Sequence, residues 1–216
     1  MGTGVDVQVW SDVVCPWCYI GKRRLEKALD GFEYDVSVTY RAFQLDPTPV
    51  RTPVPLKQAL AAKFGGPQRA EQMWAHVTAL AATEGLRLNF ERAINANTFD
   101  AHRLVAWATG QGRQAEMVDA LQRAHFTDGV DVGSRAALAK VAASVGLDPA
   151  AAYRALESGT GAASVRADQA EARDLGISSV PTFVVDYRYA IQGAQEPATL
   201  RAALEEIARR EDVEAR

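Results

Sequence analysis

The chain has 216 residues, of which 48% are hydrophobic and 24% charged, a composition typical of a globular protein with a large core. Its formal net charge of −3 provides no basic field for phosphate backbones, which argues against nucleic-acid binding. Residues 1–9 lack the basic and apolar stretches of a secretory leader, and no apolar run could span a bilayer, so we expect a cytoplasmic protein without a membrane partner.

Three elements are predicted near the start of the chain. In residues 5–10, valines alternate with polar residues, which is typical of a strand, and a second alternating run covers residues 36–43. Between them, apolar positions at steps of three and four predict a helix over residues 19–29. A strand, a helix and a strand in this order predict a parallel strand pair joined by a helical crossover.

Residues 46–176 form a long stretch with helical periodicity that is rich in alanine and leucine. It opens with a loop that contains the prolines at positions 47, 49, 53 and 55. Candidate helices cover residues 56–64, 68–84, 98–110, 113–126, 134–145, 150–157 and 162–175, and glycines stand where several of them are expected to stop. A connection of this length cannot be a loop, so we expect a folded helical insertion.

The chain returns to strands after this insertion. Residues 182–186 and 189–192 are predicted strands joined by a short turn, and a final helix is predicted over residues 197–210. A strand–helix–strand unit before the helical insertion and a strand–strand–helix unit after it together predict an α/β protein with a thioredoxin-like fold and an inserted all-helical domain. The expected domains are residues 1–46 with 177–216 for the thioredoxin-like part and residues 47–176 for the helical part.

The two cysteines of the chain, Cys15 and Cys18, form a Cys-x-x-Cys motif between the first predicted strand and helix. If Cys15 begins the helix, Pro16 takes the first helical position, where its missing N–H costs nothing. The Cys15 thiol then faces the free N–H groups and the positive end of the helix, which favours the reactive thiolate. We therefore expect Cys15 to be the nucleophile, and the more buried Cys18 to resolve the mixed disulfide.

Two other uses of the cysteine pair carry less weight. A zinc site needs about four ligands, and His76, His102 and His125 stand at no ligand spacing from the pair, so no metal is expected. A structural disulfide would close a very short loop and add little stability. The pair therefore predicts redox chemistry.

The dipeptide between the cysteines bears on the redox potential and on substrate contact. Pro16 and Trp17 carry no charge that would stabilise a thiolate. We expect a potential between that of a strong reductant and that of the strongest oxidants, roughly −270 to −120 mV. An exposed Trp17 would offer a substrate a flat apolar contact.

Pro181 precedes the strand predicted at residues 182–186. A proline at such a place commonly marks only a strand start or a sheet edge. The alternative is a cis Val180–Pro181 bond in a loop packed against Cys15, which would present the backbone of Val180 to an extended substrate. The pattern alone leaves both interpretations open.

Several segments together suggest a known family. They are residues 11–21 (SDVVCPWCYIG), 40–47 (YRAFQLDP), 97–104 (NTFDAHRL), and 180–183 (VPTF) followed by 193–195 (GAQ). These segments resemble the DsbA family of thiol-disulfide oxidoreductases, specifically its FrnE-like branch. The matches run in order over nearly the whole chain.

The resemblance implies dithiol–disulfide exchange, with Cys15 as nucleophile, Cys18 as resolving thiol and a cis bond before Pro181. Relatives with a serine in place of the first cysteine bind glutathione, and some are isomerases or transferases of aromatic carboxylates. This chain keeps both cysteines, which favours redox chemistry. We expect no tightly bound cofactor, with glutathione as a candidate redox partner.

Two polar residues are further candidates for the site. His102, in the first turn of the helix predicted at 98–110, is either satisfied by neighbours at the edge of the core or faces the cleft near Cys15. There it could hydrogen-bond a substrate or assist proton transfer at Cys18. Asp12 either caps a turn or relays a proton to the resolving sulfur. The other expected substrate contacts are Pro16, Trp17, Val180 and Pro181.

The leading functional hypothesis is a cytoplasmic thiol–disulfide oxidoreductase, with isomerase activity as an option, acting on a disulfide- or thiol-containing protein or small molecule. The alternative is a glutathione-dependent isomerase or transferase of a small aromatic substrate, in which Cys15 only positions or activates a thiol. A third interpretation is a binding module whose cleft holds an apolar client without redox chemistry. Replacing Cys18 with serine separates the first two, because only dithiol exchange requires the second sulfur.

Overall fold

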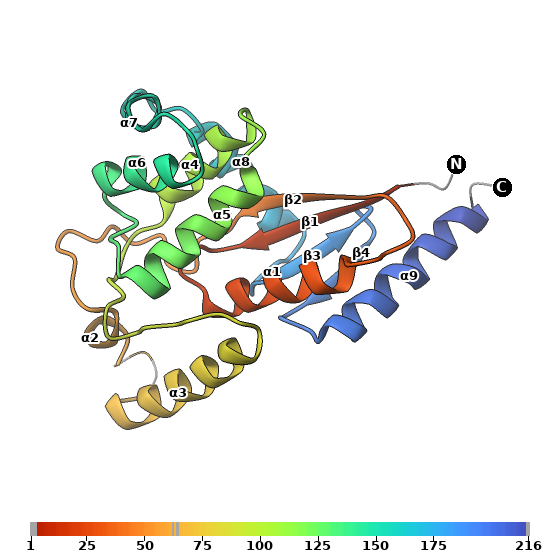
Figure 1. Cartoon of the computed structure of the whole chain (residues 1–216), viewed down its shortest axis with the longest axis horizontal. Coiled ribbons are helices and arrows are strands. Elements are labelled where there is room, and N and C mark those ends of the chain that lie inside the picture. The colour runs from red at the N-terminus through yellow and green to blue at the C-terminus, as the bar shows by residue number, and fades with distance from the viewer. Residues whose placement is uncertain (1–3, 62, 64, 215–216) are drawn as a thin grey trace.

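The computed structural model of the chain describes residues 4–61, 63 and 65–214 (Figure 1). Its sheet has the strand order β2-β1-β3-β4. The strands are β1 (Val5–Ser11), β2 (Val36–Ala42), β3 (Thr182–Val185) and β4 (Tyr189–Gln192). β1 and β2 are parallel, whereas β3 runs antiparallel to both β1 and β4. The predicted strand–helix–strand unit is thus confirmed, and β1 lies inside the sheet.

The two faces of the sheet bury different side chains of β1, because successive residues of a strand point to opposite faces. On one face, Val7 and Val9 share a core with Leu25 of α1 (Pro16–Leu29) and Leu204 of α9 (Pro197–Glu214). On the other face, Trp10 packs near Ala172 of α8 (Ala162–Asp174). Helices α1 and α9 contact each other along the first face, and the start of β1 and the end of α9 lie at the same end of the molecule (Figure 1).

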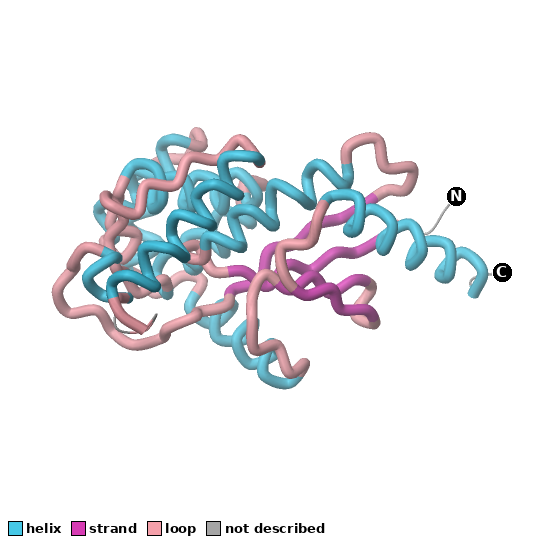
Figure 2. The backbone as a smooth tube through the Cα atoms, turned by 90° about the horizontal axis from the view of Figure 1, so that it is seen from below, coloured by secondary structure: helices cyan, strands magenta, loops and turns pink. Residues whose placement is uncertain are grey.

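The segment between β2 and β3 is helical, as predicted. Its helices are α2 (Leu56–Leu60), α3 (Pro67–Thr83), α4 (Phe99–Thr109), α5 (Gln114–Arg123), α6 (Arg135–Ser144), α7 (Pro149–Glu157) and α8. Figure 2 shows most of these helices gathered at one end of the molecule and the strands towards the other. The helix predicted at 56–64 is shorter than expected: α2 ends at Leu60, and residues 62 and 64 lie outside the described part of the chain.

Within the residues that the structure describes, no helix has both the length and the apolar character needed to cross a membrane.

The helix predicted at 113–126 also differs from the structure. α5 ends at Arg123, and the chain continues as a π-helical turn, η1 (Ala124–Asp128), which adds one residue to the hydrogen-bonded turn. Gly129 ends this turn with a φ of 71°, in the left-handed region. A Cβ atom at Gly129 would lie 2.6 Å from the carbonyl oxygen of Arg92, so this position requires glycine on two counts.

Side chains from the helical segment hold the free edge of β2. The side-chain amide of Gln114 accepts from the N–H of Tyr40 (3.0 Å) and donates to its carbonyl (3.1 Å), as a neighbouring strand would. Asp168 of α8 accepts from the N–H of Ala42 (2.9 Å) and from Arg41 (2.9 Å). These bonds satisfy an edge that would otherwise be open to another chain and fix the helices relative to the sheet.

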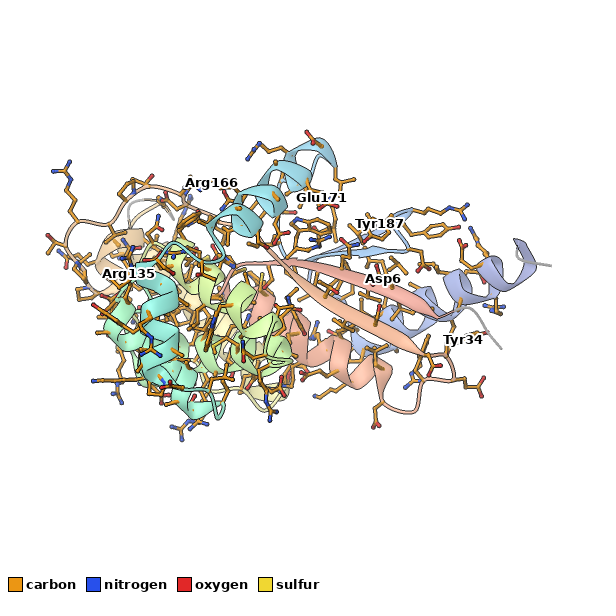
Figure 3. All side chains as sticks on the ribbon, turned by 90° about the horizontal axis from the view of Figure 1, so that it is seen from above. Asp6, Tyr34, Arg135, Arg166, Glu171 and Tyr187 are labelled. Atoms are coloured by element: carbon orange, nitrogen blue, oxygen red, sulfur yellow. The ribbon has the colours of Figure 1, made fainter. Side chains whose placement is uncertain are left out.

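α8 connects the two parts of the molecule. It contacts α4 on one side and β2 on the other. In Figure 3, Arg166 and Glu171 mark its course from the helical end, where Arg135 lies, towards the sheet, where Asp6 lies. The domain boundary expected at residue 176 assigns α8 to the insertion, and it stays a prediction.

Candidate active site

Cys15 stands at the N-terminal end of α1, as predicted. It is the N-cap residue with extended backbone angles (φ −94°, ψ 114°), and Pro16 follows at the first helical position. The carbonyl of Cys15 accepts from the N–H of Cys18 at 3.1 Å and begins the helical hydrogen bonds. The thiol differs from the expectation: it makes no capping bond to the first turn. Instead, its Sγ donates to the carbonyl oxygen of Val180, 3.7 Å away.

Cys18 lies one helical turn beyond Cys15, and both thiols are free and buried. Burial raises the pKa of the Cys18 thiol well above its ordinary value, and the neighbouring Cys15 acts in the same direction. The backbone of Asp12 and the side chain of Ser11 oppose this increase in pKa. Both cysteines belong to one buried apolar cluster, and the inner thiol holds its proton tightly.

A proline loop covers the cysteine pair. The Val180–Pro181 peptide bond is cis, as the family resemblance implied, and Val180 packs in one apolar cluster with Cys15 and Cys18. Gly21 of α1 permits this close packing, because a Cβ atom there would lie 2.8 Å from Cγ of Pro181. This contact was not predicted from the sequence. The available signal was a glycine inside a helix, where glycine lowers stability.

Three exposed apolar side chains belong to segments that meet the cysteine turn or its buried cluster. Trp17, between the cysteines, is 37% exposed, as predicted. Leu45 is 51% exposed, and its N–H donates to Asp12 three residues before Cys15. Leu175 is 50% exposed at the end of α8, two residues before Ile177 in the cysteine cluster. We call Trp17, Leu45 and Leu175 the apolar rim; sequence analysis identified only the first.

Asp12 and His102 form a buried pair. Nε2–H of His102 donates to Oδ1 of Asp12 (3.2 Å) and to the carbonyl oxygen of Phe43 (3.1 Å). Since the carbonyl can only accept, Nε2 carries the proton. Oδ2 of Asp12 accepts from the N–H of Leu45 at 2.8 Å. The pair therefore joins the cysteine turn, the chain after β2 and the start of α4, which matches the interpretation of His102 as a histidine satisfied by its neighbours.

The other two histidines lie in different surroundings. His76 of α3 is exposed, with its ring centroid 6.4 Å from that of Trp17. His125 is completely buried in η1, and neither ring nitrogen has a hydrogen-bond partner among the described residues. Burial lowers the pKa of His125 to about 4, although the nearby charge of Asp12 opposes this change.

Comparisons with known proteins agree with this geometry. The family model described as "DSBA-like thioredoxin domain" matches residues 6–205. A crystal structure of a probable DsbA oxidoreductase from Streptomyces coelicolor is 37% identical, with a TM-score of 0.87 over 94% of this chain and 89% of that chain. The Bacillus subtilis protein YwbO is 28% identical over 183 residues, 84% of this chain and 86% of that protein.

A more distant structure shares the fold. It is the cytosolic disulfide reductase DsbM from Pseudomonas aeruginosa with GSH, which is 20% identical with a TM-score of 0.66 and covers 94% of this chain and 99% of that chain. The family-model match over residues 6–205 includes both the thiol pair at the start of α1 and the cis-proline loop. Because this match covers well over half of the chain, the chain belongs to the family of DsbA-like thioredoxin domain proteins.

Proposed function

We propose that this protein is a thiol–disulfide oxidoreductase in which Cys15 is the nucleophile and Cys18 the resolving thiol. The observation that carries the proposal is a pair of free, buried thiols at the start of α1 that share one apolar cluster with Val180 of the cis-proline loop. A nucleophile at a helix start and a second thiol one turn away satisfy the geometric needs of disulfide exchange.

The exchange proceeds in two balanced steps. The Cys15 thiolate attacks one sulfur of a substrate disulfide, the other substrate sulfur leaves as a thiolate, and a mixed disulfide forms. Cys18 then loses its proton and attacks the Cys15 sulfur, which releases the second substrate thiolate. The enzyme is left with a Cys15–Cys18 disulfide and the substrate with two added electrons. The same steps in reverse oxidise a substrate dithiol.

Substrate binding follows from what surrounds Cys15. The carbonyl of Val180, which accepts from the thiol in this structure, is placed to pair with the backbone of an extended substrate. The exposed side chains of the apolar rim are the proposed source of apolar contacts with the substrate. These features favour a polypeptide that carries a disulfide or thiol, and Pro16, Trp17, Val180 and Pro181 are its proposed contacts. Isomerase activity and membership of the FrnE-like branch belong to the same proposal.

Glutathione is the proposed redox partner, and the GSH in the DsbM structure supports this choice. The description of DsbM as cytosolic also supports the proposed cytoplasmic location. The same observation favours one alternative function, a glutathione-dependent isomerase or transferase of a small aromatic substrate. In that case Cys15 would position a thiol, and Cys18 would be dispensable.

A trapping experiment tests the proposal. Cys18→Ser should hold its partners as mixed disulfides through Cys15, because nothing resolves them, and turnover of a model protein disulfide should fall to background. Cys15→Ser is the matched control and should trap nothing. Turnover that survives in Cys18→Ser would favour the glutathione-dependent alternative. Failure of both the parent enzyme to exchange disulfides and Cys18→Ser to trap would refute the redox function.

A further inference from the structure

A pocket of about 630 Å³ lies beside the chain that leaves β2. Its walls come from the proline-containing segment 47–53, from the start of α4, from α6 and the loop before it, and from the middle of α8. In Figure 3, Arg135 and Arg166 mark its place at the helical end of the molecule. The pocket is thus a second site, separate from the thiol pair.

The charges that line this pocket do not cancel. Asp100 and Arg135 form an ion pair (2.7 Å) and offset each other. Arg51 and Arg166 have no ion pair with any residue that the structure describes, and the same holds for Asp131, which accepts a backbone N–H of its own loop (2.9 Å). Two guanidinium groups therefore stand against one carboxylate, and the pocket attracts anionic groups.

The positions of both guanidinium groups are prepared in advance. The Arg166 guanidinium lies over the ring of Phe99, 5.4 Å from its centroid. A guanidinium on an aromatic face keeps its N–H edges free, and these edges match the two oxygens of a carboxylate. The segment that carries Arg51 is held by the side-chain amide of Asn97, which donates to two of its carbonyls (3.0 and 3.1 Å).

Two segments lead from the pocket to the cysteines. Gln44 lines the pocket, and the preceding Phe43 packs against the buried cluster that contains both thiols. Along α8, Arg166 precedes Ala172 of the same cluster by six positions, a rise of about 9 Å. An extended polypeptide covers that length in about three residues. A substrate joined to Cys15 can therefore place a nearby side chain in the pocket.

We propose that this pocket selects polypeptide substrates with acidic side chains a few residues from the reacting cysteine, which pair with Arg51 and Arg166. This inference rests on the proposed dithiol exchange and specifies the class of polypeptide that takes part in it. A nucleic acid is a less suitable anion, because the chain as a whole carries a net charge of −3.

Two peptides of equal length test the proposal in a single turnover of the reduced enzyme. Each has one cysteine joined by a disulfide to a chromophoric thiol, which the exchange releases. One peptide carries glutamates about three to five residues from the cysteine on both sides, and the other carries glutamines at the same places. The wild-type rate constant at limiting peptide should be about tenfold higher for the acidic peptide, a size that two partly exposed ion pairs permit.

The double variant Arg51→Gln, Arg166→Gln should lower this ratio to about one, with the loss falling on the acidic peptide. The matched control is Arg69→Gln, Arg87→Gln, which removes the same charge from two exposed arginines outside the pocket and should keep the wild-type ratio. In 1 M salt the wild-type preference should shrink, since exposed charges are screened.

Binding without chemistry is measured by fluorescence anisotropy. A labelled acidic peptide with serine in place of cysteine should bind about tenfold more weakly to the pocket variant than to wild type. Equal rates for the two peptides in wild type would overturn the inference, and so would a preference that the control variant also loses. A wild-type enzyme that reacts with neither peptide would refute the proposed function, while the anisotropy comparison would still decide whether the pocket binds acidic segments.

Discussion

A Cβ atom at Gly21 would lie 2.8 Å from Cγ of Pro181. Helix α1, which contains Cys18 and begins directly after Cys15, therefore touches the cis-proline loop through a position without a side chain. The carbonyl that accepts from the Cys15 thiol belongs to the residue before this proline. The separation between sulfur and loop is thus set by the absence of one methyl group on the helix.

Gly21→Ala should move the proline loop away from Cys15. We expect a loss of about 1–3 kcal/mol in the free energy of unfolding, as for other overpacked interiors. We also expect kcat/KM for disulfide exchange to fall roughly ten- to a hundredfold, because small displacements of reacting groups have effects of that size. Denaturant unfolding and a reductase assay measure the two quantities.

Gly31→Ala is the matched control for this variant. Gly31 has a φ of 64°, and a Cβ atom there would meet nothing within 4 Å. The change should destabilise by about 1 kcal/mol through backbone strain and leave kcat/KM unchanged. Equal losses of activity in the two variants would show that stability, not the position of the loop, is responsible.

Glu84→Ala should be strongly destabilising. Its buried carboxylate accepts from Nε of Arg24 and from Lys27, each at 2.7 Å, and both partners lie on α1. Without the Glu84 carboxylate, the buried charge of Arg24 loses one of its charged partners. We therefore expect the free energy of unfolding, measured with denaturant, to fall by about 3 kcal/mol. The exposed pair of Arg113 and Glu116 is the control, and Glu116→Ala should change stability by less than about 0.5 kcal/mol. Similar small effects of both variants would contradict the prediction.

His125 should make the fold sensitive to acid. Its pKa is about 4 in the folded protein against an ordinary 6.5, so between these pH values the unfolded chain binds one proton more than the native one. Stability therefore falls as the pH is lowered through this window. Each pH unit corresponds to about 1.4 kcal/mol, and the total for this group is about 3 kcal/mol.

The comparison of wild type with His125→Leu isolates this contribution. The variant should be at least as stable as wild type at pH 7, because it removes the two ring nitrogens of His125 that find no hydrogen-bond partner in the described part of the chain. It should lose less stability than wild type between pH 6.5 and pH 4 in urea unfolding. Parallel stability curves for the two proteins would rule out a buried neutral imidazole.

The apolar rim should select for polypeptide substrates. We expect the double variant Leu45→Ser, Leu175→Ser to raise KM for an unfolded protein disulfide by roughly tenfold, which is about 1.4 kcal/mol of binding free energy. The rate with glutathione disulfide should not change, because so small a substrate reaches the sulfur without the rim. Tyr187→Ser is the control, since this side chain is exposed in the turn between β3 and β4 (Figure 3). Equal effects on both substrates would argue against the rim as a binding surface.

The uncharged Pro16–Trp17 dipeptide predicts an intermediate redox potential. Equilibration in glutathione buffers, with the Cys15–Cys18 state read by alkylation, should give a value between roughly −270 and −120 mV. A value outside this range would mean that groups other than the dipeptide set the redox potential of the Cys15–Cys18 pair.

Much of the fold could be predicted from local pattern. Alternating valines identified β1, helical spacing identified α1, and Pro16 marked where that helix begins. The predicted lengths of α2, α5 and α9 differ from the structure for a common reason: periodicity indicates which face of a helix is buried, not where its hydrogen bonds change or end. The π-helical turn after Arg123 breaks no hydrophobic pattern, so the sequence carried no signal for it.

The sequence by itself determined the proposed chemistry, because the proposed nucleophile, the proposed resolving thiol and the helix start are adjacent along the chain and need no long-range information. Only the tertiary structure decided what surrounds the two sulfurs. Val180 reaches Cys15 from 165 positions away, and the apolar rim assembles Leu45 and Leu175 from distant segments. A cavity lined by Ser11 and His102 draws its walls from five separate elements, β1, β2, α4, α5 and α8. Such contacts depend on how the elements pack, which no local pattern of residues encodes.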